Sequence, residues 1–146
     1  MSGVLLDVNL LIALAWPQHV HHAIAQAWFA KASRHSWATC PLTQLAFVRI
    51  SSNPRIIPEA VSPRDAAKLL KAVSRLPRHV FWNDDLSVLD LKLFESLTLA
   101  GHRQVTDAYL LELAEKHDGR LATLDKGVAD LTSHPKERAT RVVMVS

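Results

Sequence analysis

The chain has 146 residues, of which 49% are hydrophobic and 21% are charged, a composition typical of one globular domain and not of a disordered or fibrous chain. Its 17 basic and 14 acidic residues give a formal net charge of +3, which permits a polyanionic partner without requiring one. The single cysteine, Cys40, excludes an internal disulfide and a cysteine-based zinc cluster, and it favours a reducing, cytoplasmic setting.

Hydrophobic patterning predicts strands that alternate with helices along the chain. In chain order we expect a strand at residues 4–7, helices at 9–15 and 19–34, a strand at 37–40, a helix at 41–52, a helix that begins after Ser62, a strand at 79–82, a helix at 86–97, a helix that Thr106 caps and Gly119 ends, and strands at 120–124 and 140–145. This alternation predicts an α/β sandwich with a mostly parallel central sheet of four to five strands flanked by helices, in a single domain over residues 1–146.

Two local patterns sharpen the helix assignments. Ser62, Pro63 and Asp65 form a helix start, with a serine cap, a proline in the first position and an acid in the first turn. Glu112 and Lys116 are one turn apart, so we expect them to pair on the solvent face of their helix. The longest apolar stretch, residues 10–16, is too short to cross a membrane, and we expect no membrane partner.

Three carboxylates stand at comparable places in the predicted elements. Asp7 and Asp125 each end a short apolar run, and Asp107 lies at the start of a helix. Because the carboxyl ends of parallel strands meet at one edge of a sheet, we expect these acids to gather there. Crowded carboxylates repel by about 4 kcal/mol per pair at about 4 Å and an effective dielectric constant of about 20. A divalent cation removes that cost, so the pattern favours an oxygen-ligand site for Mg²⁺ or Mn²⁺.

Each of these acids also has a purely structural explanation, which the individual motifs leave open. Asp107 in a first helical turn stabilises the helix through its dipole, Asp125 is compatible with a turn before a glycine, and Asp7 with a plain strand end. Asn9 is compatible with a helix cap and with a role in orienting Asp7. Only the three acids as a set favour the metal site.

Read together, several stretches resemble the PIN-domain ribonucleases, with a closer match to the VapC-type toxins of bacterial toxin–antitoxin pairs. The stretches are residues 5–9, 104–110 and 121–125, with further similarity at 38–43, 47–49 and 101–103. The resemblance implies a PIN-like three-layer sandwich and a metal-dependent endoribonuclease. In the family, the acids that match Asp7, Asp107 and Asp125 hold Mg²⁺ or Mn²⁺ and position a water that attacks an RNA phosphodiester. The resemblance also implies a homodimer and a VapB-type antitoxin protein.

One position departs from the family pattern. Many relatives carry a glutamate where this chain has Gln44, so we expect lower metal affinity and a second metal that is harder to hold. Asp84 or Asp85 is a candidate to replace the missing charge, although both also fit the start of a helix. Arg49 and Arg103 are candidates to bind RNA phosphates, and a structural ion pair is an equal alternative for each.

Three other interpretations compete with the ribonuclease. Gln44 raises the alternative of a non-catalytic or weakly active RNA-binding PIN domain. An aspartate-nucleophile phosphatase would need a carboxylate two residues after Asp7, where Asn9 stands. A phosphate-loop NTPase would need a glycine-rich cradle, and the four glycines form none. His19, His21 and His22 are compatible with a soft-metal site, but their position at a helix start favours a solvated face.

Overall fold

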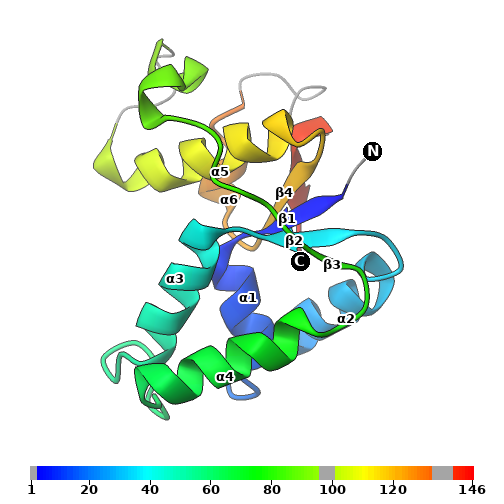
Figure 1. Ribbon diagram of the computed structural model, residues 1–146, viewed down its shortest axis with the longest axis vertical. Helices are drawn as coiled ribbons and strands as arrows, with labels where there is room; N and C mark the ends of the chain where they lie inside the picture. Colours follow the sequence, from blue (N-terminus) through cyan, green and yellow to red (C-terminus); the bar gives the residue numbers. More distant parts are fainter. Residues whose placement is uncertain (1–2, 96–100, 133–139) are drawn as a thin grey trace.

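The computed structural model describes residues 3–95, 101–132 and 140–146, and these residues fold around one parallel β-sheet (Figure 1). The strands stand in the order β3-β2-β1-β4-β5, and every neighbouring pair is parallel. They are β1 (Val4–Leu6), β2 (Trp37–Thr39), β3 (His79–Phe81), β4 (Arg120–Thr123) and β5 (Val142–Met144). The predicted α/β class and parallel sheet are therefore confirmed.

The helices form one layer on each face of the sheet, so that the described part of the chain is a three-layer sandwich. One layer contains α1 to α4, and the other contains α5 and α6 (Figure 1). The helices are α1 (Val8–Ala15), α2 (His22–Ala32), α3 (Pro41–Ser51), α4 (Pro63–Ser74), α5 (Val105–Lys116) and α6 (Lys126–Ala129). Within the described ranges, none of them combines the length and apolar character that a membrane crossing requires.

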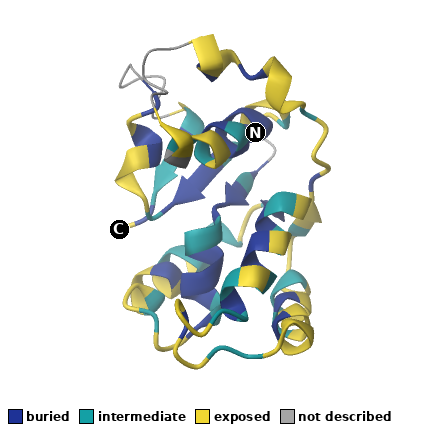
Figure 2. Cartoon of the chain, turned by 90° about the vertical axis from the view of Figure 1, so that its left-hand side faces the viewer, coloured by how far each residue is buried: buried dark blue, intermediate teal, exposed yellow. Residues whose placement is uncertain are grey.

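Alternation along the strands supplies both layers with a hydrophobic core. Leu5 and Leu121 pack against α5, whereas their neighbours Leu6 and Ala122 pack against the layer of α1 to α4. Successive side chains of a strand point to opposite faces. Because both faces are covered at the centre of the sheet, β1, β2 and β4 are largely buried, whereas Val80 and Phe81 of the edge strand β3 are exposed. The buried residues concentrate along the sheet and the inner faces of the helices (Figure 2).

The helix predicted over residues 86–97 is wrong within the residues that the structure describes, and residues 96–97 lie outside them. Two short 3-10 turns replace it, at Val88–Asp90 and Lys92–Glu95. The carboxylate of Glu112 accepts hydrogen bonds from the backbone N–H groups of Lys92 (2.8 Å) and Leu93 (3.0 Å). These donors are thereby fixed by a side chain of α5, so a contact distant in sequence overrides the local helical pattern.

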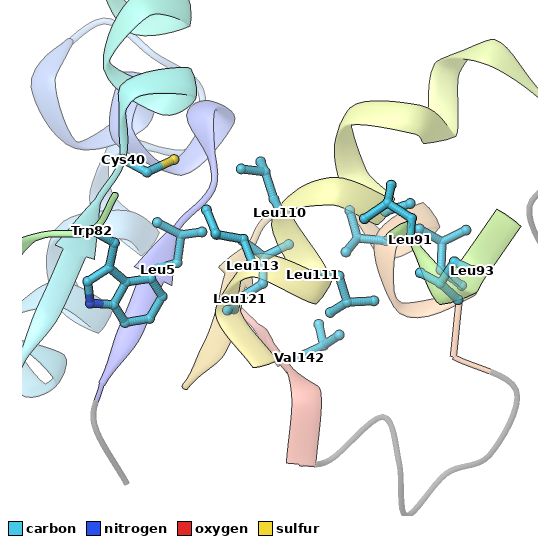
Figure 3. Packing of buried hydrophobic residues seen from close by; sticks show 14 of the residues in the cluster. Leu5, Cys40, Trp82, Leu91, Leu93, Leu110, Leu111, Leu113, Leu121 and Val142 are labelled. Carbon is cyan, nitrogen blue, oxygen red and sulfur yellow. The ribbon is translucent and has the colours of Figure 1, made fainter. Parts of the chain in front are cut away.

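Glu112 and Lys116 do not form the predicted surface pair. Glu112 is buried beneath the segment of the two 3-10 turns, and Lys116 donates instead to the backbone carbonyl of Asp85. Figure 3 shows the leucines of α5 between Leu5 on one side and Leu91 on the other. Because α5 is covered on two sides, its expected solvent face is largely interior.

The ends of two helices also differ from expectation. Thr106 does not cap α5, which begins at Val105 after a 3-10 turn at His102–Gln104. At the amino-terminal end of α2, Val20 lies outside the helix and is 84% exposed, so it does not belong to the predicted apolar stripe. The α4 start is as predicted, since the Ser62 hydroxyl accepts the Asp65 N–H at 3.1 Å.

The packing at the end of α5 explains why residue 119 is a glycine. Asp118 has the left-handed backbone conformation (φ 56°), and the Gly119 N–H donates to the Ala114 carbonyl at 2.8 Å, an arrangement that closes the helix. A Cβ atom on Gly119 would lie 2.5 Å from the Gly3 carbonyl oxygen and 2.7 Å from the Trp82 ring. Gly119 is therefore required for close approach between α5, β1 and Trp82, and not for its own dihedral angles.

Candidate active site

The site lies where the strand order reverses. From β1 the chain builds β2 and β3 on one side, and β4 and β5 stand on the other, so the carboxyl ends of β1 and β4 flank a crevice. Asp7 follows β1, Asp125 follows β4, and Asp107 lies in the first turn of α5. All three line one open hollow of about 380 Å³, hereafter the acidic hollow. The structure thus brings together the three acids that are separated by up to 118 positions in the chain.

Asp7 is buried and both of its carboxylate oxygens are engaged. One oxygen accepts the Val8 N–H at 2.8 Å and caps α1, and the other accepts the Thr123 hydroxyl at 2.7 Å. Burial raises the pKa of Asp7 above its usual value, the bonds from Thr123 and Val8 act in the opposite direction, and Asp125 raises the pKa further. These contacts fix the orientation of the carboxylate before any ligand arrives.

Thr123 connects two of the acids. Its hydroxyl oxygen donates to Asp7 and accepts the Asp125 backbone N–H at 3.0 Å. The Asp125 carboxylate is exposed and accepts the Gly127 N–H at 2.8 Å, which caps the short helix α6. Asn9 accepts the Leu124 N–H at 3.4 Å and so joins the start of α1 to the end of β4. Asn9 therefore contacts the backbone before Asp125 and not Asp7, the acid it was predicted to orient, and the cap of α1 is Asp7 itself.

Asp107 shows that the acids influence one another. Burial, and after it the charges of Asp7 and Asp125, together raise the pKa of Asp107 to about 6. A carboxyl group in this state is partly protonated near neutral pH unless a cation compensates the neighbouring charges. The electrostatics of the acidic hollow therefore favour the binding of a positive ion.

The rim of the acidic hollow is partly basic and partly apolar. Arg49 is exposed and lines it from α3, and Ile12, Ile50 and Ile56 supply apolar wall. His19 also lines it, although its place in the sequence indicated a solvated face. The turn between α1 and α2 brings this imidazole to the rim, since the His19 Nδ1 accepts the His21 N–H at 3.0 Å. No periodic signal in the sequence marks His19, because it belongs to a turn.

Gln44 does not line the acidic hollow. Its amide donates to the Thr39 hydroxyl at 3.0 Å, and it lies in a neighbouring hollow between α3 and α4, which shares Arg49 with the acidic one. Position 44, where the sequence comparison with the family pattern led us to expect a glutamate, thus lies outside the hollow of the three aspartates.

The remaining candidates lie elsewhere. Arg103 is in the 3-10 turn before α5, and its side chain is outside the described residues. Asp84 lines a small adjoining hollow with Thr106, and Asp85 accepts a hydrogen bond from His117 at 3.0 Å. Neither Asp84 nor Asp85 lines the acidic hollow, and no helix starts at them.

The donor set of the acidic hollow fits a hard divalent cation. Within the described residues, no three acidic, histidine or cysteine side chains converge tightly enough to enclose an ion on their own. Mg²⁺ does not require such a cage, since it keeps several waters and binds through one or two carboxylates together with substrate phosphates. The available ligands are carboxylate oxygens, which such ions prefer over softer metals.

The chain is similar to several known proteins. The family model described as PIN domain matches residues 4–133. The chain is 45% identical over 129 residues to the ribonuclease VapC39 of Mycobacterium tuberculosis, covering 88% of this chain and 93% of that protein. It is 46% identical over 127 residues to the ribonuclease VapC38 of the same organism, covering 87% and 88%. The ribonuclease VapC29, also from that organism, is 47% identical over 128 residues, covering 88% and 90%.

Proposed function

The chain belongs to the PIN-domain family, and from this membership we propose that it is an endoribonuclease toxin of the VapC type. The observation that carries the proposal is the meeting of Asp7, Asp107 and Asp125 in one hollow, with the pKa of Asp107 raised to about 6. Such an anionic site facing a basic rim is suited to an ion that bridges protein and phosphate.

In the proposed reaction, Asp7, Asp107 and Asp125 would hold Mg²⁺ or Mn²⁺. The chemistry that such an ion would supply there is activation of water and stabilisation of negative charge on the phosphodiester. Asp7 is held by Val8 and Thr123, so its carboxylate is oriented in advance. Asp107 accepts no hydrogen bond from the described residues, so none has to be broken when its carboxylate binds an ion.

The basic residues have a different proposed task. Arg49 lines the rim from α3 and binds a phosphate that flanks the scissile one, and Arg103, in the 3-10 turn before α5, keeps the same predicted task. Phosphate contacts of this type fix the register of the strand and carry no base specificity. Specificity for a particular RNA therefore needs other groups of the rim.

Gln44 supports a second candidate function, a weakly active or non-catalytic RNA-binding domain. Its amide brings no negative charge, and its hydrogen bond to Thr39 directs it to the neighbouring hollow. We favour the enzyme, because the three aspartates meet without a contribution from this position. The proposal also includes a VapB-type antitoxin protein, a homodimer, a cytoplasmic location and a single domain over residues 1–146.

An RNA cleavage assay tests the proposal. The wild-type chain should cut a long single-stranded RNA with Mg²⁺ or Mn²⁺, and EDTA should abolish the cutting. Asp7→Asn and Asp107→Asn should lose at least about 100-fold in rate, the scale expected when a group that stabilises the transition state is removed. Asp130→Asn is the matched control, since Asp130 is exposed just after α6 and does not line the acidic hollow.

Two results would contradict the enzyme. One is wild-type cutting that persists in EDTA, and the other is equal rates for Asp107→Asn and Asp130→Asn. If neither the wild type nor Gln44→Glu cuts RNA under any of the metal conditions, while the wild type still binds it, the non-catalytic alternative replaces the enzyme.

A further inference from the structure

A second hollow lies near the opposite edge of the sheet and is lined by basic side chains. Its volume is about 580 Å³, and it lies between the last turn of α2 and the beginnings of β1 and β4. Lys31, His35 and Arg120 line it together with the indole of Trp28. No carboxylate contributes to this lining in the part of the chain that the structure describes. We call it the basic hollow.

Arg120 has an unsatisfied donor at this place. Its Nε atom is buried and has no hydrogen-bond partner among the described residues. The Nε of Arg141, at the corresponding position before β5, is buried in the same way, but the Nη2 of Arg141 forms an ion pair with Glu115 at 3.0 Å. A buried donor without an acceptor costs free energy, and an anion in the basic hollow would let the guanidinium of Arg120 adjust to meet an acceptor.

The basic residues are not needed to neutralise the carboxyl-terminal end of α2. Carbonyls of the last turn already accept backbone hydrogen bonds. The Phe29 carbonyl accepts the Ser33 N–H at 2.9 Å, and the Ala32 carbonyl accepts the His35 N–H at 3.0 Å. The Ser33 carbonyl accepts the guanidinium of Arg78 at 3.0 Å. Lys31 and Arg120 therefore remain available for a ligand and are not used as a cap.

We propose that the basic hollow binds a nucleotide, with the phosphate between Arg120 and Lys31 and the planar base against Trp28. Arginine is suited to phosphate through its fork of donors, and tryptophan stacks on bases without regard to their identity. The volume is in the range of small-molecule sites, about 300–1,000 Å³. The apolar wall, which includes Val4 and Val143, favours a ligand with a planar body over inorganic phosphate.

This site goes beyond the proposed cleavage reaction and does not depend on it. The acidic hollow is at the carboxyl ends of β1 and β4, and these strands of three or four residues span about 10 Å. The nucleotide has two sources that share the same chemistry, a free 5′-mononucleotide and one residue of an RNA strand that passes both sites. The experiment separates these sources.

The test uses AMP as the probe and the ¹⁵N-labelled chain in EDTA, which keeps metal from the acidic hollow. AMP should shift the indole N–H resonance of Trp28 and the amide resonance of Arg120 in a saturable manner. The dissociation constant from this titration should be lower for AMP than for phosphate or adenosine. Trp28→Phe assigns the indole signal. Lys31→Gln and Arg120→Gln should each weaken the binding of AMP by about tenfold, the effect of losing one hydrogen bond to a charged group.

Two control variants accompany the titration. Arg34→Gln removes an exposed positive charge near the same helix end that does not line the basic hollow, and it should leave AMP binding unchanged. Asp7→Asn should also leave it unchanged, because the acidic hollow is separate. Lys31 is exposed, so Lys31→Gln keeps the test valid even if Arg120→Gln does not fold.

Three outcomes overturn the proposal. They are the absence of a saturable shift at Trp28, equal affinity for phosphate and AMP, and an equal loss of AMP binding in Arg34→Gln and Lys31→Gln. A 5′-phosphorylated trinucleotide of adenosine decides between the sources. Tighter binding of the trinucleotide than of AMP supports the site as a contact for RNA, and equal or weaker binding supports it as a site for free nucleotide.

Discussion

Replacement of Asp107 by asparagine should stabilise the chain at alkaline pH while it removes the proposed activity. Asp107 is half-buried beside Asp7 and Asp125, and burial together with these charges raises its pKa to about 6. The group therefore prefers to be neutral in the folded state. Asparagine has nearly the same shape and no charge, so the repulsion disappears in Asp107→Asn.

The sign and size follow from proton linkage. The pKa of Asp107 is about 6 in the folded chain and 3.8 as a model value for the unfolded chain, so the folded state binds the proton more tightly. The wild type loses stability as the pH rises from about 4 to about 6, and above that range the loss is complete. The full difference corresponds to about 3 kcal/mol, and solvent screening of this half-exposed group reduces it to about 1–2 kcal/mol.

Thermal and urea denaturation in EDTA, at pH 8 and at pH 4, measure the effect. At pH 8, Asp107→Asn should melt about 3–6 °C above the wild type, and at pH 4 the difference should nearly vanish. Asp65→Asn is the matched control, because Asp65 also lies in a first helical turn but is the one acidic residue of the first turn of α4. It should lose a few tenths of a kcal/mol at pH 8 through the helix dipole.

The reasoning is refuted if Asp107→Asn is no more stable than the wild type at pH 8, or if its advantage is the same at both pH values. Mg²⁺ provides an independent check. It should stabilise the wild type at pH 8 more than it stabilises Asp107→Asn, because only the wild type has the repulsion that the ion removes.

Three further predictions concern other parts of the molecule. Gln44→Glu should change the Mg²⁺ concentration for half-maximal cleavage by less than about tenfold, since this side chain points to Thr39, and a larger gain would show that position 44 reaches the acidic hollow. Glu112→Gln should destabilise the chain by about 2–3 kcal/mol in urea titrations, because an amide N–H₂ then faces a backbone donor, and an unchanged midpoint would contradict this. Gly119→Ala should cost about 1–3 kcal/mol through the clash with Gly3 and Trp82, whereas Gly101→Ala, with open space around it, is the control and should cost less.

The sequence sufficed to predict the sheet and the gathering of the acids. Apolar runs that end on Asp7 and Asp125 fix two strands, and the rule that parallel strands end at a common edge places these side chains together. The predicted strand boundaries agree with the observed ones within about two residues, since both the apolar run and its polar end are local signals. The position of Asp107 at this edge of the sheet follows from the same rule only when the helix that begins next to it is predicted as well.

Other features depend on contacts that no local pattern contains. Glu112 has the spacing of a solvent-facing residue, yet it is buried because the segment before residue 96 packs over α5. The same contact explains why Leu91 and Leu93 bury their side chains from short turns and not from a helix. Arg120 in β4 and Lys31 in α2 come from elements far apart in the chain, so the hollow that both of them line has no signature in the sequence.

The hydrogen bonds of the acidic hollow explain how three carboxylates are tolerated and where an ion would have its largest effect. Asp7 caps α1 and Asp125 caps α6, so each negative charge faces the positive end of a helix and accepts a backbone N–H. Asp107 lies in the first turn of α5 but accepts no hydrogen bond from the described residues, and its pKa is the one raised to about 6. Its charge is the least compensated of the three. The free energy that an ion supplies is therefore realised chiefly at Asp107, and substitution there should weaken metal binding more than substitution of the exposed, capped Asp125.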